Sequence, residues 1–407
     1  MSSHDVTGGA ALARCTARTM SEFAPYWGAA PLLTRASEIG GGFDDLLDAA
    51  AVDELVSRRG LRTPFLRMAK EGTVLGAKEF TRGGGAGAGI ADQAADDRVL
   101  AQLADGATLV LQGLHRTWPP LVSFGSQLAA ELGHPVQINA YITPAQNRGF
   151  APHYDVHDVF VLQVAGRKHW RIHAPVVSDP LENQNWEKSR AEVSARAADA
   201  PVIDCVLEPG DALYLPRGTI HSADALGEVS IHLTVGIHPI TRYQLVRQLL
   251  ERAQQDEALR ASLPVGVDLA DPAVLAPHLA ATVDALRDYV DRVRVDEIAR
   301  GVGETLTAQT RPEPIAPLEQ LAAADALRPD TPLRLRQALR YRLDEGADHV
   351  QLRLIDRTVS LPHSTAAALK LALSGEPLTP ADLPGLDAHD QLTVARRLVR
   401  EGVLVTA

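Results

Sequence analysis

The spacing of apolar residues changes along the chain. From residue 107 to residue 240, Val, Ile, Leu and Tyr form short runs bounded by Gly, Pro, Asn or Asp. Runs of about four to eight such residues between turn formers are typical of strands, so this stretch predicts an all-β sandwich or barrel. Beyond residue 241 apolar residues recur at i and i+4, as at Leu245, Leu249 and Ala253, which predicts a module of amphipathic helices.

The C-terminal part has a mixed pattern. A proline-rich joint at residues 311–317 leads into a last unit, where residues 350–362 alternate like a strand and hairpin. A helix closed by Gly402 and a final strand follow, and this combination suggests a winged helix. Because residues 330–407 carry ten Lys/Arg and ten Asp/Glu, we expect a structural or protein-contact role there and not DNA binding.

Composition narrows the class of protein. The chain has 407 residues and a net charge of −11, enough length for two or three globular domains. The acidic balance argues against a protein that coats nucleic acid and would suit a basic protein or peptide partner, although solubility explains it equally well. Cys15 and Cys205 lie too far apart for a zinc ribbon, an iron–sulfur cluster or a disulfide scaffold. Without an apolar window of about 18 residues or a signal-peptide core in residues 1–20, we expect a cytoplasmic protein.

Two short motifs carry candidate metal ligands. His153 and Asp155 are two residues apart, so on a strand they would face the same side and could share one ion. The second motif, the turns at 209–211 and 216–218 followed by His221, predicts a double hairpin that brings an imidazole into a small antiparallel barrel. Two His and one carboxylate suit a non-haem Fe(II) oxygenase. Zinc hydrolysis is the alternative, although the chain lacks a His-Glu-x-x-His helix.

Lys168 is a further signal, because it falls in a mostly apolar segment that predicts a hairpin over residues 159–172. An inward-facing ammonium is costly without a counter-charge, which a bound dicarboxylate would supply. The alternative is that Lys168 extends to the barrel rim. A straight strand from Asp155 to Lys168 would span about 40 Å. We therefore expect a bend at residues 156–158 and a turn at Gly166.

In combination, these motifs resemble the JmjC-type ribosomal oxygenases of the cupin superfamily. The resemblance rests on Tyr26-Trp27, Pro31-Leu32, Asn139 to Pro144, Gly149-Phe150, His153-Tyr154-Asp155, Phe160 to Gln163, Gly166-x-Lys168, Trp170, Pro209-Gly210-Asp211 and His221. It implies an α+β chain with three parts. These are a double-stranded β-helix, the cupin/JmjC jelly-roll barrel, over residues 1–240, a helical dimerisation module over 241–316 and a winged-helix-like domain over 317–407.

The resemblance also implies roles for individual residues. His153, Asp155 and His221 would bind Fe(II) as the catalytic metal ligands. Lys168 would pair with the distal carboxylate of the cosubstrate 2-oxoglutarate, helped by the hydroxyls of Tyr141 and Thr234. Asn139, grouped with the cofactor-binding residues, and Ser230 would take supporting or substrate-contacting roles, or else hydrogen-bond within turns and strands. Five further histidines are expected at the rim or in structural positions, not as a fourth ligand: His157, His169, His173, His232 and His238.

The implied function is an Fe(II)- and 2-oxoglutarate-dependent dioxygenase that uses O₂ to hydroxylate a histidine or arginine of a ribosomal protein. It would act as a homodimer, with no direct contact to nucleic acid or membrane. Lys168 favours a histidine target, since arginine-hydroxylating bacterial members typically carry Arg there, and Gly236 stands where some members place a hydroxyl residue near the substrate. The alternatives are the same chemistry on a peptide natural product or another cytoplasmic protein, and a non-catalytic cupin used for binding or assembly.

Overall fold

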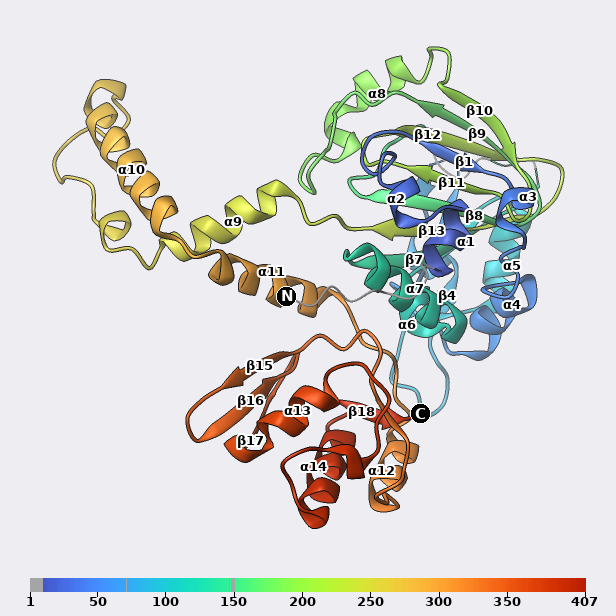
Figure 1. The fold of residues 1–407 in the computed structure, drawn as a ribbon. Helices are drawn as coiled ribbons and strands as arrows, with labels where there is room; N and C mark the ends of the chain where they lie inside the picture. The colour runs from blue at the N-terminus through green and yellow to red at the C-terminus, as the bar shows by residue number, and fades with distance from the viewer. Residues whose placement is uncertain (1–9, 71, 146, 148–150) are drawn as a thin grey trace. The chain divides into compact units, whose positions relative to one another are not determined.

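The computed structural model describes residues 10–70, 72–145, 147 and 151–407. It divides into two compact units. One runs to Pro239 and takes in Pro312–Ala316, and the other comprises Ile240–Arg311 with Pro317–Ala407 (Figure 1). The three-domain division with boundaries at 240 and 316 stays a prediction. Gly149-Phe150, part of the motif set above, lies outside the described residues.

Two antiparallel sheets form the first unit. The larger has the strand order β1-β11-β8-β13-β7-β6-β2-β3, and the smaller has the order β10-β9-β12. The strands of the larger sheet are β1 (Leu32–Thr34), β2 (Leu66–Lys70), β3 (Thr73–Val74), β6 (Thr108–Leu111), β7 (Val136–Thr143), β8 (Asp158–Ala165), β11 (Ala212–Leu215) and β13 (Ser230–Ile237). Those of the smaller sheet are β9 (Lys168–His173), β10 (Ile203–Leu207) and β12 (Ile220–Ala225). A separate two-stranded ribbon, β4 (Thr81–Arg82) and β5 (Gln93–Ala94), flanks a glycine-rich segment at residues 83–89.

Strand β8 is buried on both faces, in agreement with its mostly apolar sequence. Phe160 and Leu162 point into the main core, whereas Val159 and Val161 pack with Trp170 of the smaller sheet. Side chains alternate along a strand, so β8 separates a helix-covered layer from the layer between the two sheets. The predicted two-sheeted β architecture is confirmed.

The predicted pairing of successive strands is wrong. Strand β8 belongs to the larger sheet and β9 to the smaller one, so the turn at Gly166 carries the chain between sheets and closes no hairpin. The turn between β10 and β11 and the turn between β11 and β12 also carry the chain from one sheet to the other, because β11 belongs to the larger sheet. Turn residues mark where a strand ends but do not determine which strand it pairs with. The predicted bend and turn are confirmed, since β8 begins at Asp158 and Gly166 has a φ of 61°.

Helices cover the outer face of the larger sheet. Leu12 of α1 and Phe124 and Leu128 of α7 share one apolar core with β8. Helix α7 follows the expected rules, with proline in its first turn and a left-handed Gly133 at its end. The helices of this unit are α1 (Ala10–Thr16), α2 (Met20–Phe23), α3 (Ala36–Ile39), α4 (Ala49–Arg58), α5 (Asp96–Ala104), α6 (Leu114–Thr117), α7 (Pro119–Leu132) and α8 (Arg190–Arg196).

The second unit begins with the predicted helices, α9 (Arg242–Ala253), α10 (Pro272–Arg292) and α11 (Val295–Gln309). Its C-terminal part has a separate apolar core. That part contains α12 (Pro317–Asp325), β14 (Leu333–Leu335), β15 (Arg342–Glu345), β16 (His349–Arg353), β17 (Thr358–Pro362), α13 (Ala366–Ala372), α14 (Ala388–Arg400) and β18 (Leu404–Thr406). Its winged-helix character stays a prediction. In the described part of the chain no helix is both long enough and apolar enough to cross a bilayer.

Candidate metal centre and its pocket

His153 and His221 form an isolated antiparallel bridge. The amide of His153 donates to the carbonyl of His221 at 3.2 Å, and the amide of His221 donates back at 2.8 Å. The ring centroids lie 4.5 Å apart. His153 therefore precedes β8 as a single bridge residue and not within a strand as predicted, but the bridge still brings its imidazole beside that of His221.

Both imidazoles are held in one tautomer. Nδ1 of His153 lies 2.8 Å from the carbonyl of Ala151, and Nδ1 of His221 lies 3.0 Å from that of Thr219. A carbonyl oxygen only accepts, so each Nδ1 carries the proton and each Nε2 keeps its lone pair for a metal ion. Burial lowers the pKa of His221 to about 4, so this ring is neutral, as a ligand must be, at ordinary pH.

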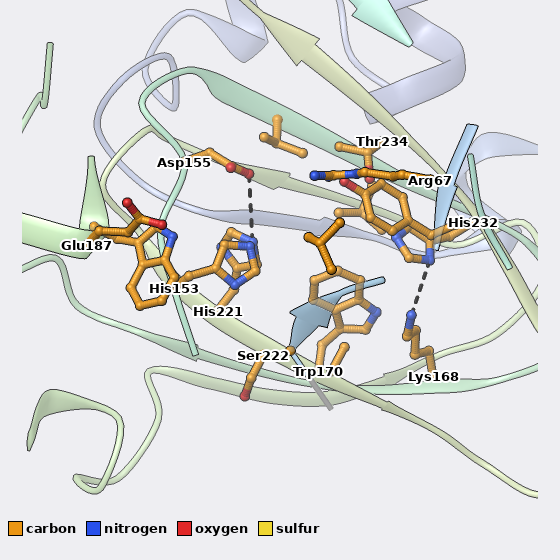
Figure 2. A pocket seen from close by; sticks show the side chains of 17 residues that line it. Arg67, His153, Asp155, Lys168, Trp170, Glu187, His221, Ser222, His232 and Thr234 are labelled. Carbon is orange, nitrogen blue, oxygen red and sulfur yellow. Dashed lines mark hydrogen bonds and ion pairs between the residues drawn. The ribbon is translucent and has the colours of Figure 1, made fainter. Parts of the chain in front are cut away.

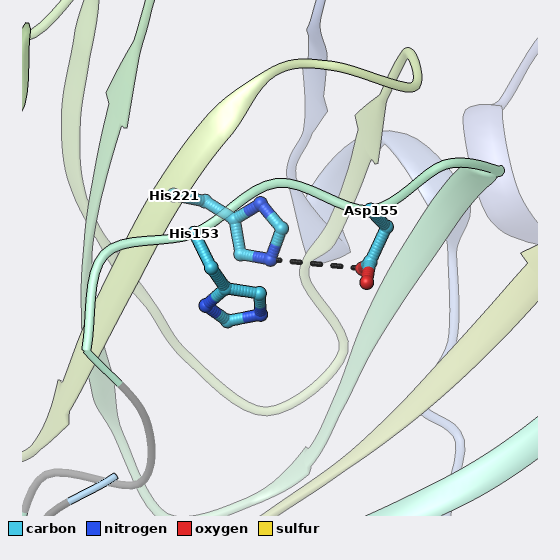
Figure 3. Close-up of side chains that lie close together, drawn as sticks. All are labelled: His153, Asp155 and His221. Atoms are coloured by element: carbon cyan, nitrogen blue, oxygen red, sulfur yellow. Dashed lines mark ion pairs between the residues drawn. The ribbon is translucent and has the colours of Figure 1, made fainter. Parts of the chain in front are cut away.

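Asp155 completes the group (Figure 3). Its Oδ2 lies 3.8 Å from Nε2 of His221, and one ligand atom from each of the three side chains falls within 4.8 Å of the others. Burial acts to raise the pKa of Asp155, but the nearby His157, His221 and His153 outweigh it and lower the pKa. Within the described residues this is the one such group, and its two imidazoles and one carboxylate fit a divalent transition metal.

The three side chains lie at one end of a cavity of about 310 Å³. Figure 2 shows Lys168 and His232 at the opposite end, with Trp170 between. The cavity is lined by Arg67, Gly72, Val74, Tyr141, His153, Asp155, Val159, Val161, Lys168, Trp170, Trp186, Glu187, His221, Ser222, Ala223, His232 and Thr234. A volume of this size suits one small cosubstrate.

Lys168 is buried and faces the cavity, not the rim. Its Nζ donates to Thr143 Oγ1 at 3.1 Å and lies 3.5 Å from Nδ1 of His232. Among the residues that the structure describes, no carboxylate lies within ion-pair distance of this ammonium. Burial lowers the pKa of Lys168 to about 7, against a weak opposing field from Asp224. A buried cation surrounded by neutral groups fits the carboxylate of a small ligand.

The other predicted site residues are placed differently. Tyr141 and Thr234 line the cavity, as expected for residues near a cosubstrate. Asn139 is not among the lining residues, and its Oδ1 instead accepts from the amide of Gly113 at 3.0 Å. Ser230 is buried and accepts from Gln163 Nε2 at 2.9 Å, which is the structural role offered above as its alternative.

Sequence reasoning missed several lining residues. His232, expected at the rim, stacks on Tyr141 inside the cavity. It lies two residues before Thr234 on β13, so strand alternation could have placed it there. Arg67 comes from β2, and no local spacing indicated that this strand borders the cavity. Trp186 and Glu187 come from the segment between β9 and β10, where no pattern indicated them.

The remaining histidines are not part of the group formed by His153, Asp155 and His221. His169 pairs with Asp204 on the opposite face of β9 from Lys168 and Trp170, and His173 is buried. His157 and His238 form a pair with ring centroids 5.0 Å apart.

Comparison with known proteins gives a family match that falls mainly within the β-stranded first unit. A family model described as "JmjC domain" matches residues 123–245. Ribosomal oxygenase 2 of Mus musculus is 33% identical over 175 residues, covering 40% of this chain and 36% of that protein. Bifunctional lysine-specific demethylase and histidyl-hydroxylase NO66 of Drosophila persimilis is 40% identical over 139 residues, 32% of this chain and 19% of that protein.

A longer match supports the same relationship. Ribosomal oxygenase 1 of Danio rerio is 28% identical over 326 residues, covering 69% of this chain and 59% of that protein. The chain spans less than two thirds of each of these relatives. The predicted resemblance to the JmjC ribosomal oxygenases is confirmed.

Solved structures extend the likeness to the whole fold. The ribosomal oxygenase YcfD of Escherichia coli, in complex with cobalt and succinic acid, matches with a TM-score of 0.55 at 18% identity. A complex of the same protein with cobalt and 2-oxoglutarate gives a TM-score of 0.51. Each match covers 96% of this chain and 98% of the other. Both parts of the chain therefore have counterparts in one known architecture.

Proposed function

We propose that this protein is an Fe(II)- and 2-oxoglutarate-dependent oxygenase that hydroxylates a histidine or arginine side chain of a ribosomal protein. The observation that carries the proposal is the cavity with a two-histidine, one-carboxylate group at one end and a buried lysine at the other. The similarity to ribosomal oxygenases and to the YcfD complex with cobalt and 2-oxoglutarate supports the same chemistry.

Each residue of the cavity has a specific task in this proposal. His153, His221 and Asp155 would hold the metal ion, which supplies the redox chemistry with O₂ when bound. Lys168 would pair with the distal carboxylate of 2-oxoglutarate, and the hydroxyl of Thr143, which already accepts from Lys168, orients that ammonium. Tyr141 and Thr234 would add hydroxyl donors. The walls formed by Val159, Val161 and Trp170 exclude water from the cosubstrate.

The proposed homodimer rests on exposed apolar residues of the second unit. Helices α9 to α11 carry many exposed apolar residues, including Leu245, Leu250, Leu279 and Val295. Residues 241–316 would form the interface of a homodimer and residues 317–407 a winged-helix domain with a protein-contact role. The enzyme would act in the cytoplasm without binding nucleic acid or membrane.

The first test compares intact masses of ribosomal proteins from the native host with and without the gene. Loss of a single-oxygen mass increment from one protein supports the proposal and identifies the substrate. In vitro, the purified enzyme with Fe(II), 2-oxoglutarate and O₂ should release succinate, and Asp155→Ala should abolish the release. The matched control is Asp356→Ala, an exposed carboxylate in the other unit.

The negative outcomes separate the alternatives. Succinate release with unchanged ribosomal masses would move the substrate search to peptides and other proteins. No succinate from metal-loaded wild-type protein would contradict the oxygenase chemistry and favour a binding or assembly role.

A further inference from the structure

Residues 174–202 connect β9 to β10 and reach the metal end of the cavity, and we call them the β9–β10 segment. Trp186 and Glu187 of this segment line the cavity, and the ring centroid of Trp186 lies 6.2 Å from that of His153. Most of the segment's other side chains are exposed to solvent. The few contacts that it makes with the rest of the first unit therefore determine where it lies.

The apolar contacts of the segment are made with residues adjacent to the metal ligands. Tyr154, Val193 and Ile220 form a small core of their own, and each is at most 2% exposed. Tyr154 stands between the first two metal ligands, Ile220 directly precedes the third, and Val193 comes from α8 of the segment. Four half-buried residues of the segment pack against this core: Val176, Val177, Trp186 and Ala197.

The ligand-bearing backbone is thus packed on both of its sides. The three metal ligands line the cavity, whereas Tyr154 and Ile220 are not among the lining residues and belong to the small core. Successive side chains of an extended chain point to opposite sides. A shift of Tyr154 or Ile220 in the small core must therefore move the ligands that neighbour them in the chain.

Two polar contacts tie the segment to the same stretches of backbone. The hydroxyl of Tyr154 donates to the carbonyl of Gln184 at 2.8 Å. Nη2 of Arg217 lies 2.9 Å from Oδ1 of Asp179, and Arg217 belongs to the turn that precedes β12 and its metal ligand. Both ligand-bearing stretches are therefore joined to the segment by apolar and by polar contacts.

We propose that the β9–β10 segment positions the metal ligands, and that Tyr154, Val193 and Ile220 are the positioning residues through which it acts. Metal binding then stabilises the docked segment, and the docked segment raises the metal affinity by the same factor, because a coupling between two equilibria is reciprocal. This inference rests on the metal site of the proposed function but not on its hydroxylase activity.

The first measurement follows the segment itself. Hydrogen–deuterium exchange of the full-length protein is recorded by mass spectrometry with and without zinc(II), which also accepts two histidines and one carboxylate. Zinc should slow the exchange of the amides of residues 186–200, because a docked segment opens less often. The amides of α14, in the other unit, are the internal control and should exchange at the same rate in both samples.

Val193→Ala tests the small core from the side of the segment and leaves the neighbours of the ligands unchanged. Zinc affinity, measured by competition with a chelating dye, should fall at least about fivefold, the lower end of the range typical of coupled sites. Zinc should also lose its effect on the exchange of residues 186–200. Val99→Ala is the matched control, because Val99 is 2% exposed on α5 and packs in the main core. It should lose comparable stability and bind zinc normally.

Asp179→Asn tests the polar contact with Arg217 and provides a second route if Val193→Ala does not fold. Asparagine tolerates the left-handed backbone of Asp179, which has a φ of 51°, but lacks the charge. We expect zinc binding to weaken about twofold, the effect of one exposed ion pair. Asp199→Asn is the control, since it removes a pair with Arg196 that lies within the segment, and it should bind zinc normally.

The outcomes separate this inference from the proposed function. Unchanged zinc affinity in both segment variants, or zinc-independent exchange of residues 186–200 in a protein that binds zinc, would overturn the inference and leave the oxygenase proposal standing. An equal loss in Val99→Ala would also overturn it, because zinc affinity would then follow overall stability. Weaker zinc binding in the segment variants, without succinate release from iron-loaded wild type, would support the inference and contradict the oxygenase. A wild type that binds no zinc would overturn both.

Discussion

The amide of Gly218 donates to the backbone carbonyl of Asp155 at 2.9 Å. This bond ties the turn before β12 to the segment before β8, and two neighbouring contacts strengthen the tie. Oδ1 of Asp158 accepts from the amide of Arg217 at 2.7 Å, and His153 and His221 exchange both backbone bonds. The two ligand-bearing segments are therefore held together by their backbones, so the metal ligands are positioned before any ion binds.

Gly218→Ala should disrupt this arrangement. Gly218 has a φ of 86°, and a Cβ there would lie 2.5 Å from the carbonyl oxygen of Val177. Backbone strain alone costs about 1–2 kcal/mol, and the overlap with Val177 must move the turn that precedes His221. We expect cobalt(II) affinity, followed by its visible absorption, to fall at least tenfold.

Gly227→Ala is the matched control for that substitution. Gly227 also has a positive φ, 74°, but nothing lies within 4 Å of its Cβ position. The Gly227→Ala variant should lose only the stability that backbone strain costs, and it should keep its cobalt affinity. Equal cobalt affinities in the two variants would contradict the claim that the Gly218 turn positions His221.

Lys168→Met should stabilise the first unit, most strongly at low pH. Burial lowers the pKa of Lys168 to about 7 from an ordinary 10.5. Between these values the unfolded chain holds a proton that the folded chain lacks, so the wild-type free energy of unfolding rises with pH in this window. The advantage of Lys168→Met is therefore full below pH 7 and shrinks by about 1 kcal/mol per pH unit above it.

Denaturant unfolding at several pH values checks this prediction. All four tryptophans, Trp27, Trp118, Trp170 and Trp186, lie in the first unit, so their fluorescence reports on that unit alone. Lys78→Met, at an exposed position, should show no such pH dependence. A constant difference between Lys168→Met and wild type from pH 6.5 to 8.5 would show that Lys168 does not titrate in this range.

The affinity for 2-oxoglutarate should fall as pH rises above about 7. A dicarboxylate binds the protonated ammonium of Lys168, so binding at pH 8 must take up a proton, and affinity falls by up to about tenfold per pH unit. Calorimetry in two buffers of different ionisation enthalpy measures this uptake. Because the pKa of His221 is about 4, that ring does not titrate in the same window.

Lys168→Arg is the control for this pH dependence. A guanidinium stays charged throughout the range, so its variant should bind 2-oxoglutarate without proton uptake. The same uptake in both proteins would assign the proton to another group.

The sequence predicted the strands, the helices and the closeness of His153 and Asp155 well, because each of these features is local. Apolar runs mark strands, and His153 and Asp155 are neighbours in the chain. Strand pairing was predicted wrongly, because the choice between a hairpin and a crossover depends on which sheet buries each face. Turn residues such as Gly166 are the same in both cases.

The residues of the cavity wall were predicted less completely than the group of His153, Asp155 and His221. Lys168, Tyr141 and Thr234 line it as expected, whereas Asn139 lies off the wall and bonds to Gly113, which comes from a distant segment. Arg67 and Glu187 also come from segments remote in sequence. Their contribution depends on tertiary packing, which no local spacing encodes.

A charged substitution on α9 should separate the two chains of the proposed dimer. Leu250 is 53% exposed on this helix, and a glutamate there would be desolvated in an apolar interface. We expect light scattering at micromolar concentration to report two chains for wild type and one chain for Leu250→Glu, with succinate release retained. Leu100→Glu, at a 67% exposed leucine of α5 in the first unit, controls for the added charge and should remain a dimer. A monomeric wild type at this concentration would contradict the dimer, and an unchanged mass for Leu250→Glu would move its interface away from this face of α9.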